Sequence, residues 1–416
     1  MLINTLMMAR LTRASERIVW PVAIVGFWLV TGTASITMDA VTQGRWSTFW
    51  IAAALWATLV CAIAVVLVWQ RVRFVDALRA IPAYWALLAL AALSIVWSAA
   101  PLWTAQRVAT LAGVFAVGLF FATQFSPRRS LVLIQACLGA VVLLSAAVAL
   151  ATPDLGVQFD GAWRGVFGQK NWLGNAAAFW IVISCGMLLF SRSRPSVLFS
   201  AVCCLAGCWV LWQSASVSAS VGTLAGVGLA VALRLVQAGW LRAWHLLVMA
   251  LVVMSLVWLE FQRLVAVVGR DPHLTGRVDM WQTLWPIMLD RPWLGYGYEA
   301  YLFADGIPER LGHWREFFLS GAGAHNGFIS IQLDVGLIGV MLAVLLFIQL
   351  GLRAACWVRD RAITRERCIA ASLWLVILLH QLTEPSLLMP VTLTVFLLVY
   401  TATVTAPHAD SLRRDG

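Results

Sequence analysis

Long apolar runs recur through this sequence, and each is about as long as a bilayer is thick. A helix needs about 20 apolar residues to cross the hydrocarbon core, and the chain is 62% hydrophobic and 12% charged. This composition excludes a soluble globular protein and predicts an all-α, polytopic membrane helix bundle of about 12 transmembrane helices. The predicted spans are 18–38, 49–69, 81–97, 108–124, 130–151, 171–190, 197–212, 217–236, 243–261, 327–350, 369–383 and 387–404.

Arginine residues gather in every second connection between the predicted spans, and this alternation sets the orientation. The cytoplasmic loops of membrane proteins carry the excess of basic residues, so the arginine-rich side and both termini are predicted to be cytoplasmic. Arg10, Arg13 and Arg17 precede the first span, which we expect to be a retained helix rather than a cleaved signal. The net charge of +10 follows from this topology, so no nucleic-acid partner is expected.

One long polar connection interrupts the apolar pattern and divides the chain into three predicted parts. Residues 1–258 hold nine spans, residues 259–326 form an outer, periplasmic loop, and residues 327–416 hold three spans and a cytoplasmic tail. Within the loop, the apolar spacing predicts an amphipathic helix over 275–290 that ends before Pro292. Its predicted apolar face contains Val278, Trp281, Trp285 and Met288.

The residues that could carry chemistry concentrate around this loop. His325 precedes an apolar span, and an imidazole at the membrane–water boundary suits general-base work on a hydroxyl. The alternative is a helix cap or a lipid-headgroup contact. Asn326, beside it, is expected to bind substrate. Arg277 begins the amphipathic helix, where a guanidinium can hold a phosphate or a diphosphate, or a lipid headgroup. Tyr298, with Trp281, offers an aromatic wall for a sugar or an interface belt.

Other candidates lie outside the loop. Arg164 and Lys170, in a glycine-containing connection on the outer side, could cradle an anion. Arg107 is expected in the loop before the fourth span, as an anion contact or an anchor. Glu384, in a turn between the last two spans, could orient an acceptor sugar, pair with an arginine, or be solvated. Asp334, within a predicted span, is expected to face the bundle interior, as is His380.

No metal or cofactor is expected from the sequence. The eight cysteines lie in spans or cytoplasmic loops, and no pair has zinc-site spacing. Cys203, Cys204 and Cys208 fall within one apolar run, where small, polarizable side chains fill space. We therefore predict neither a metal site nor a disulfide.

A set of short motifs, in a fixed order over most of residues 97–340, resembles a known family. Taken together they are similar to the O-antigen ligase and polysaccharide polymerase superfamily, the Wzy-type glycosyltransferases of the bacterial inner membrane. The motifs are Trp97-Ser98…Pro101…Arg107, Phe167-Gly168-Gln169-Lys170-Asn171-Trp172-Leu173-Gly174, Thr275-Gly276-Arg277…Trp281, Gly295-Tyr296-Gly297, and His325-Asn326-Gly327…Gly336-Leu337-Ile338-Gly339.

The resemblance implies a GT-C-like, metal-independent enzyme that works on the periplasmic face of the inner membrane. The implied donor is a glycan on undecaprenyl diphosphate, and the acceptor is another glycan or lipid A-core. Arg277, with a second cation, would hold the diphosphate, and His325 would take the proton of the attacking hydroxyl in an inverting transfer. A flippase and a chain-length protein are possible partners.

The resemblance leaves three functions open. Ligase-like members usually carry an arginine near the outer end of the eighth span, where this chain has the serine-rich stretch 214–220. The motif around Lys170 and the Leu382-Thr383-Glu384-Pro385 turn look more like the exopolysaccharide-polymerase branch, so we favour a polymerase. A ligase that transfers glycan to lipid A-core is the first alternative. A polysaccharide or lipid transporter without covalent chemistry is the second, although the spans lack an evident repeat.

Overall fold

The computed structural model describes residues 19–31, 60, 63, 75, 78–242, 245, 277–319, 323–389 and 392–406. These residues form helices joined by turns and short loops, with no strand among them and one isolated bridge between Val157 and Trp163. The all-α prediction is therefore confirmed for the described part of the chain.

Six of the described helices are long and apolar enough to cross a membrane. Three shorter apolar helices lie at Val19–Val30, Pro82–Val96 and Leu393–Val404. The six candidate spans are α6 (Pro101–Gln124), α7 (Pro127–Ala151), α9 (Lys170–Phe190), α10 (Arg194–Gln213), α11 (Val217–Gln237) and α16 (Gly327–Arg359).

The predicted spans correspond closely to several of these helices. Prediction and structure differ by a few residues at most for α7, α9, α10 and α11. The predicted spans 49–69 and 243–261 lie almost wholly outside the described residues, so the count of about 12 remains a prediction. The remaining helices of the bundle are α5 (Pro82–Leu93) with the 3-10 turn η1 (Ser94–Val96), α17 (Arg365–Thr383) and α18 (Leu393–Val404).

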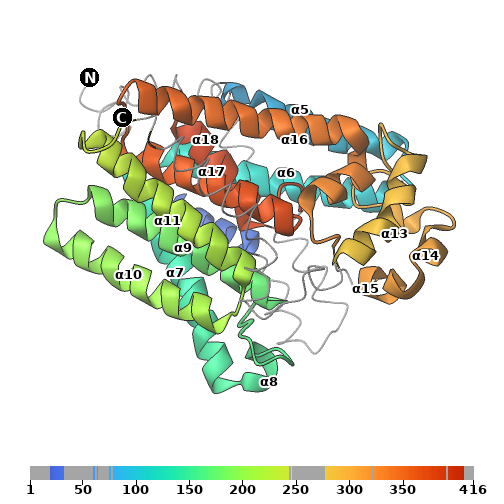
Figure 1. The fold of residues 1–416 in the computed structure, drawn as a ribbon, viewed down its shortest axis with the longest axis horizontal. Coiled ribbons are helices and arrows are strands. Elements are labelled where there is room, and N and C mark those ends of the chain that lie inside the picture. The colour runs from blue at the N-terminus through green and yellow to red at the C-terminus, as the bar shows by residue number, and fades with distance from the viewer. Residues whose placement is uncertain are drawn as a thin grey trace, which may run out of the picture. The chain divides into compact units, whose positions relative to one another are not determined.

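The described residues cluster into two compact units. Two helices, α6 and α11, have residues in both units. Unit 1 contains residues 112–223 and 391–416 with the N-terminal 80 residues, and unit 2 contains 81–111 and 224–390. The boundaries of these units differ from those of the three parts expected from the sequence. That three-part division remains a prediction. Figure 1 shows the helices by label.

In unit 1, small and polar residues bring α7, α9 and α10 together. A Cβ on Gly139 of α7 would lie 2.6 Å from the Trp180 ring of α9, so only glycine allows this close approach. Gln135 of α7 donates hydrogen bonds to Ser184 of α9 at 3.0 Å and to Ser200 of α10 at 3.4 Å. These bonds satisfy polar groups that water does not reach inside the bundle.

In unit 2, α16 lies beside both α5 and α17 (Figure 1) and carries a break at Gly336. Gly336 has φ 70 and ψ −169, which interrupts the helical hydrogen bonds. Loop 292–299 supplies new partners: Tyr296 N donates to Leu333 O, Gly297 N to Asp334 O and Leu337 N to Pro292 O. The broken span is thereby fastened to the outer loop.

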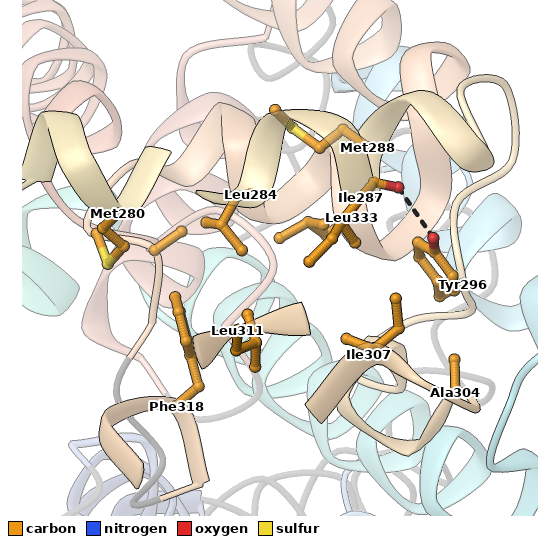
Figure 2. Packing of buried hydrophobic residues seen from close by; sticks show 11 residues of the cluster. Met280, Leu284, Ile287, Met288, Tyr296, Ala304, Ile307, Leu311, Phe318 and Leu333 are labelled. Carbon is orange, nitrogen blue, oxygen red and sulfur yellow. Dashed lines mark hydrogen bonds between the residues drawn. The ribbon is translucent and has the colours of Figure 1, made fainter. Parts of the chain in front are cut away.

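The described part of that loop, residues 277–319, folds around a hydrophobic core of its own. It contains α13 (Arg277–Asp290), the 3-10 turns η2 (Tyr301–Phe303) and η3 (Gly312–Trp314), α14 (Ile307–Arg310) and α15 (Arg315–Leu319). Figure 2 shows the inward side chains of these elements meeting Leu333 of α16. The buried members are Met280, Leu284, Ile287, Met288, Tyr296, Ala304, Ile307, Leu311, Phe318, Ala324 and Leu333.

The amphipathic helix is present, and its predicted face was right only in part. α13 ends at Asp290, as expected, and Met288 is buried as predicted, together with Met280, Leu284 and Ile287. Trp281 is partly buried against this core, whereas Trp285 is 62% exposed. Long aliphatic and sulfur-containing side chains, rather than indole rings, fill most of the small interior.

The helix break offers a test of how the loop is fastened. A Cβ on Gly336 would lie 2.2 Å from the Trp293 carbonyl group, whereas a Cβ on Gly351 of the same helix meets nothing within 4 Å. We expect Gly336→Ala to lower the free energy of unfolding by about 1–3 kcal/mol, from strain and overpacking. Gly351→Ala, the matched control, should be neutral or slightly stabilising. Thermal unfolding of the purified protein in detergent measures both, and equal midpoints would contradict this account.

Candidate active site

A buried carboxylate, that of Glu384, joins the two residues predicted to be catalytic. Glu384 follows α17 directly and is 5% exposed. Its Oε1 accepts a hydrogen bond from Arg277 Nη2 at 3.3 Å, and its Oε2 lies 2.8 Å from Nδ1 of His325. The solvated-turn reading of Glu384 is thus wrong, and the predicted pairing with an arginine is confirmed.

Arg277 connects the start of α13 to the end of α17. Its Nη1 donates to the backbone carbonyl of Thr383 at 2.9 Å, in addition to the bond with Glu384. The last carbonyls of a helix have no partner within the helix, and a cation there also interacts favourably with the helix dipole. The guanidinium is therefore held in one orientation at the site.

His325 has an unusual backbone conformation that its neighbours maintain. Its φ is 47, in the left-handed region that costs a non-glycine residue energy. On one side, the Trp281 indole donates to Ala324 O at 2.8 Å. On the other, the Asn326 side chain caps α16, accepting from Phe328 N at 2.9 Å. Trp281 and Asn326, predicted to bind substrate, thus hold the chain on both sides of the imidazole.

This arrangement can perform general-base chemistry. When Nδ1–H of His325 is donated to the Glu384 carboxylate, the tautomer is fixed and the second ring nitrogen, Nε2, carries the lone pair. Among the residues that the structure describes, none forms a hydrogen bond with that Nε2. Arg277 balances the buried charge of Glu384, because an unpaired carboxylate would be costly there.

Arg107 lies with a second charged group in unit 2. The structure places it within α6, not in a loop as expected, because that helix begins earlier, at Pro101. Its guanidinium lies 4.2 Å from the centroid of the Trp103 ring. Burial raises the pKa of Glu299, and the charge of Arg107 opposes that rise. The backbone N–H of Glu299 donates to Asp334 Oδ1 at 3.0 Å.

Tyr298, predicted as a sugar-stacking residue, is completely buried. Its hydroxyl donates to the carbonyl of Leu388, and its backbone N–H donates to Ser94 Oγ at 2.9 Å. Its ring therefore has no exposed face for a sugar and instead anchors the loop to two other segments of unit 2. Asp334 and His380 are buried too, as the sequence predicted.

Arg164 and Lys170 lie in unit 1, in and after the loop that follows α8 (Pro153–Gly156). Arg164 Nε donates to Leu155 O at 2.9 Å, and Lys170 forms an ion pair with Asp160. The hydrogen bond from Lys170 lowers the pKa of the Asp160 carboxyl. No sequence motif marked Asp160. Its ion pair with Lys170 explains how a lysine can lie on the outer side of the predicted topology.

The predicted site residues thus belong to two different units. Arg107, Arg277, Trp281, Tyr298, His325, Asn326 and Glu384 all belong to unit 2, and the two cations near α9 belong to unit 1. Phe317 was also missed: its ring centroid is 5.7 Å from that of His325. No sequence motif marked it. Among the described residues there is no group of three or more His, Cys, Asp or Glu that could hold a metal ion.

Comparison with known proteins gives two matches. A family model described as O-antigen ligase matches residues 177–344, a segment that includes Arg277 and His325 but ends before Glu384. The chain is also 27% identical over 202 residues to the exopolysaccharide production protein ExoQ of Rhizobium meliloti (strain 1021). That match covers 45% of this chain and 46% of the relative, so it spans somewhat less than half of that protein. Together the matches confirm the resemblance predicted from the motifs.

Substitutions in the ion pair between Lys170 and Asp160 test whether Lys170 binds substrate or has a structural role. The side chains of Lys170 and Asp160 are 22% and 34% exposed, and such partly exposed ion pairs contribute at most about 1 kcal/mol. We expect Lys170→Met and Asp160→Asn to cause small and equal losses of thermal stability and, under the function proposed below, of glycan synthesis in cells. If Lys170→Met abolished glycan synthesis while Asp160→Asn preserved it, Lys170 would be a substrate contact.

Proposed function

We propose that this chain, which is similar to the O-antigen ligase and polysaccharide polymerase superfamily, is a membrane glycosyltransferase that polymerises polysaccharide repeat units. The donor is a glycan on undecaprenyl diphosphate, and the reaction takes place at the periplasmic face of the bacterial inner membrane. The observation that carries the proposal is the chain of contacts from Arg277 through Glu384 to His325.

In the proposed reaction a hydroxyl of the acceptor attacks the anomeric carbon of the donor sugar. A new C–O bond forms as the bond between that carbon and the diphosphate oxygen breaks, and the diphosphate leaves with the electron pair. His325 Nε2 accepts the hydroxyl proton, and the configuration at the anomeric carbon is inverted. The imidazolium that results lies against the Glu384 carboxylate, which stabilises it.

Arg277 is proposed to contact the departing diphosphate. Negative charge grows on the leaving group in the transition state, and a donor held in place beforehand stabilises that charge without reorganising. The bonds to Thr383 and Glu384 provide such pre-organisation. No step of this scheme requires a metal.

Polymerase and ligase share this chemistry and differ in the acceptor. The relative's name refers to exopolysaccharide production, which favours a polymerase, as do the motifs around Lys170 and Glu384. The family description names an O-antigen ligase, so transfer to lipid A-core is the second candidate.

Glycan profiling of cells tests the function. Deletion cells would carry wild type, His325→Ala or Arg277→Ala at matched membrane levels, and the lipid-linked and finished glycans would be separated. We expect both variants to lose polymer while single repeat units accumulate on the carrier, since removing a general base costs about 10²–10⁴ in rate. Full-length polymer held on the carrier but absent from lipid A-core would indicate a ligase, and normal glycans in both variants would refute the catalytic assignment.

Glu384 is predicted to position and balance the base rather than to contact substrate. Glu384→Gln keeps the shape but removes the charge, so we expect the polymerisation rate in isolated membranes to fall by about 10²-fold or more.

The matched control is Glu366→Gln at the other end of α17, where the carboxylate pairs with Arg365 at 2.7 Å. This control removes the same charge from the same helix but leaves the site intact. It should leave the polymerisation rate unchanged. An unchanged rate in Glu384→Gln would show that Glu384 is a structural residue only.

A further inference from the structure

A line of aromatic rings runs from the outer surface of the loop to the candidate base. The His313 and Trp314 ring centroids are 5.0 Å apart, those of Trp314 and Phe317 5.6 Å, and those of Phe317 and His325 5.7 Å. We refer to His313, Trp314 and Phe317 as the aromatic track. The chemistry described above does not use these three residues.

A carboxylate fixes the outer end of the aromatic track. Asp279 Oδ2 is 3.2 Å from the indole Nε1 of Trp314 and 3.2 Å from Nε2 of His313. The Asp279 and His313 side chains are 60% and 72% exposed, so these contacts contribute little to stability. They hold the exposed His313 ring and the partly buried Trp314 ring in a set orientation, beside a carboxylate that can accept further hydrogen bonds.

The inner end of the track rests on the core of the loop. Phe318, the neighbour of Phe317 in α15, is fully buried and meets Tyr301 edge-on, with centroids 6.2 Å apart. Because Phe318 faces inward, α15 is held against the core and presents Phe317 to His325. The ring beside the base is therefore supported by packing and needs no ligand to place it.

We propose that the aromatic track is the acceptor subsite, which binds successive pyranose rings of the acceptor repeat unit. This proposal rests on the proposed function. The C–H face of a pyranose lies favourably on the negative face of an aromatic ring. The hydroxyl rim of the sugar would find hydrogen-bond partners in Asp279 and His313. Ring stacking with a few polar groups is the usual composition of a small-molecule site.

The position of the track identifies which substrate it takes. The line of rings ends at His325, the group proposed to remove a proton from the acceptor hydroxyl. The donor diphosphate is assigned to Arg277, which contacts the opposite oxygen of the Glu384 carboxylate from the one that His325 contacts. A sugar stacked on Phe317 would thus present its hydroxyl to the base and belong to the acceptor.

Binding of a carrier-free oligosaccharide tests this subsite apart from catalysis. The probe is the repeat-unit oligosaccharide released by mild acid from the lipid-linked intermediates of deletion cells. Full-length protein in lipid nanodiscs is titrated with it, and saturation-transfer NMR reports the dissociation constant. We expect Trp314→Ala and Phe317→Leu to weaken binding about tenfold or more, as the loss of an aromatic contact implies, and Asp279→Asn to weaken it less.

Two control variants make the result specific. Trp285→Ala removes another indole of the same loop, one that is 62% exposed and not part of the track, and should bind the oligosaccharide as wild type does. His325→Ala should also retain binding, since the probe needs the rings and not the base. Unchanged binding in the Trp314 and Phe317 variants, or no binding to wild type, would overturn the inference. The proposed function would still stand if His325→Ala blocked polymer in cells.

A membrane-anchoring role for the same rings can be distinguished from sugar binding by fluorescence quenching. Brominated lipids quench indoles that lie in the bilayer, so the quenching lost in Trp314→Ala measures how far this ring enters lipid. A track that binds sugar in water should show no such difference. Strong quenching that disappears with Trp314 would make the rings part of an interfacial belt and would overturn the proposal.

Discussion

The ion pair and hydrogen bond at Glu384 are the interactions on which the candidate site depends. A carboxylate buried at the end of α17 must be compensated, and the structure compensates it with the guanidinium of Arg277 and the imidazole of His325. Each partner comes from a different segment: the start of α13, the loop before α16 and the end of α17. The charge balance of the site thus also ties together the segments that form it.

Sequence reasoning located the helices well because their apolar runs leave few alternatives. The prediction 171–190 became α9 at Lys170–Phe190, and 217–236 became α11 at Val217–Gln237. It located α16 less well, predicting residues 327–350 and missing the helix break at Gly336. A glycine in an apolar run reads as an ordinary helix residue, and the break exists because loop 292–299 supplies the lost partners.

The site was predictable in its members but not in its connections. His325, Arg277 and Glu384 each carried a local signal, but Arg277 and Glu384 are 107 residues apart in the chain, and only the fold brings them together. The prediction for Tyr298 was wrong because tyrosines next to glycines are typical of sugar-stacking surfaces. In the structure this side chain is buried and anchors the loop. Phe317 gave no signal, since a phenylalanine pair in a loop does not reveal which ring faces inward.

The break in α16 also has a mechanical consequence. The nine residues Gly327–Val335 between the base and the break are bonded to the loop, and so is Leu337 just beyond the break. Transmembrane helices adjust their tilt to bilayer thickness. Because one loop holds both sides of the break, a change in the tilt of this helix would move the loop and the imidazole together, so the site keeps its internal geometry.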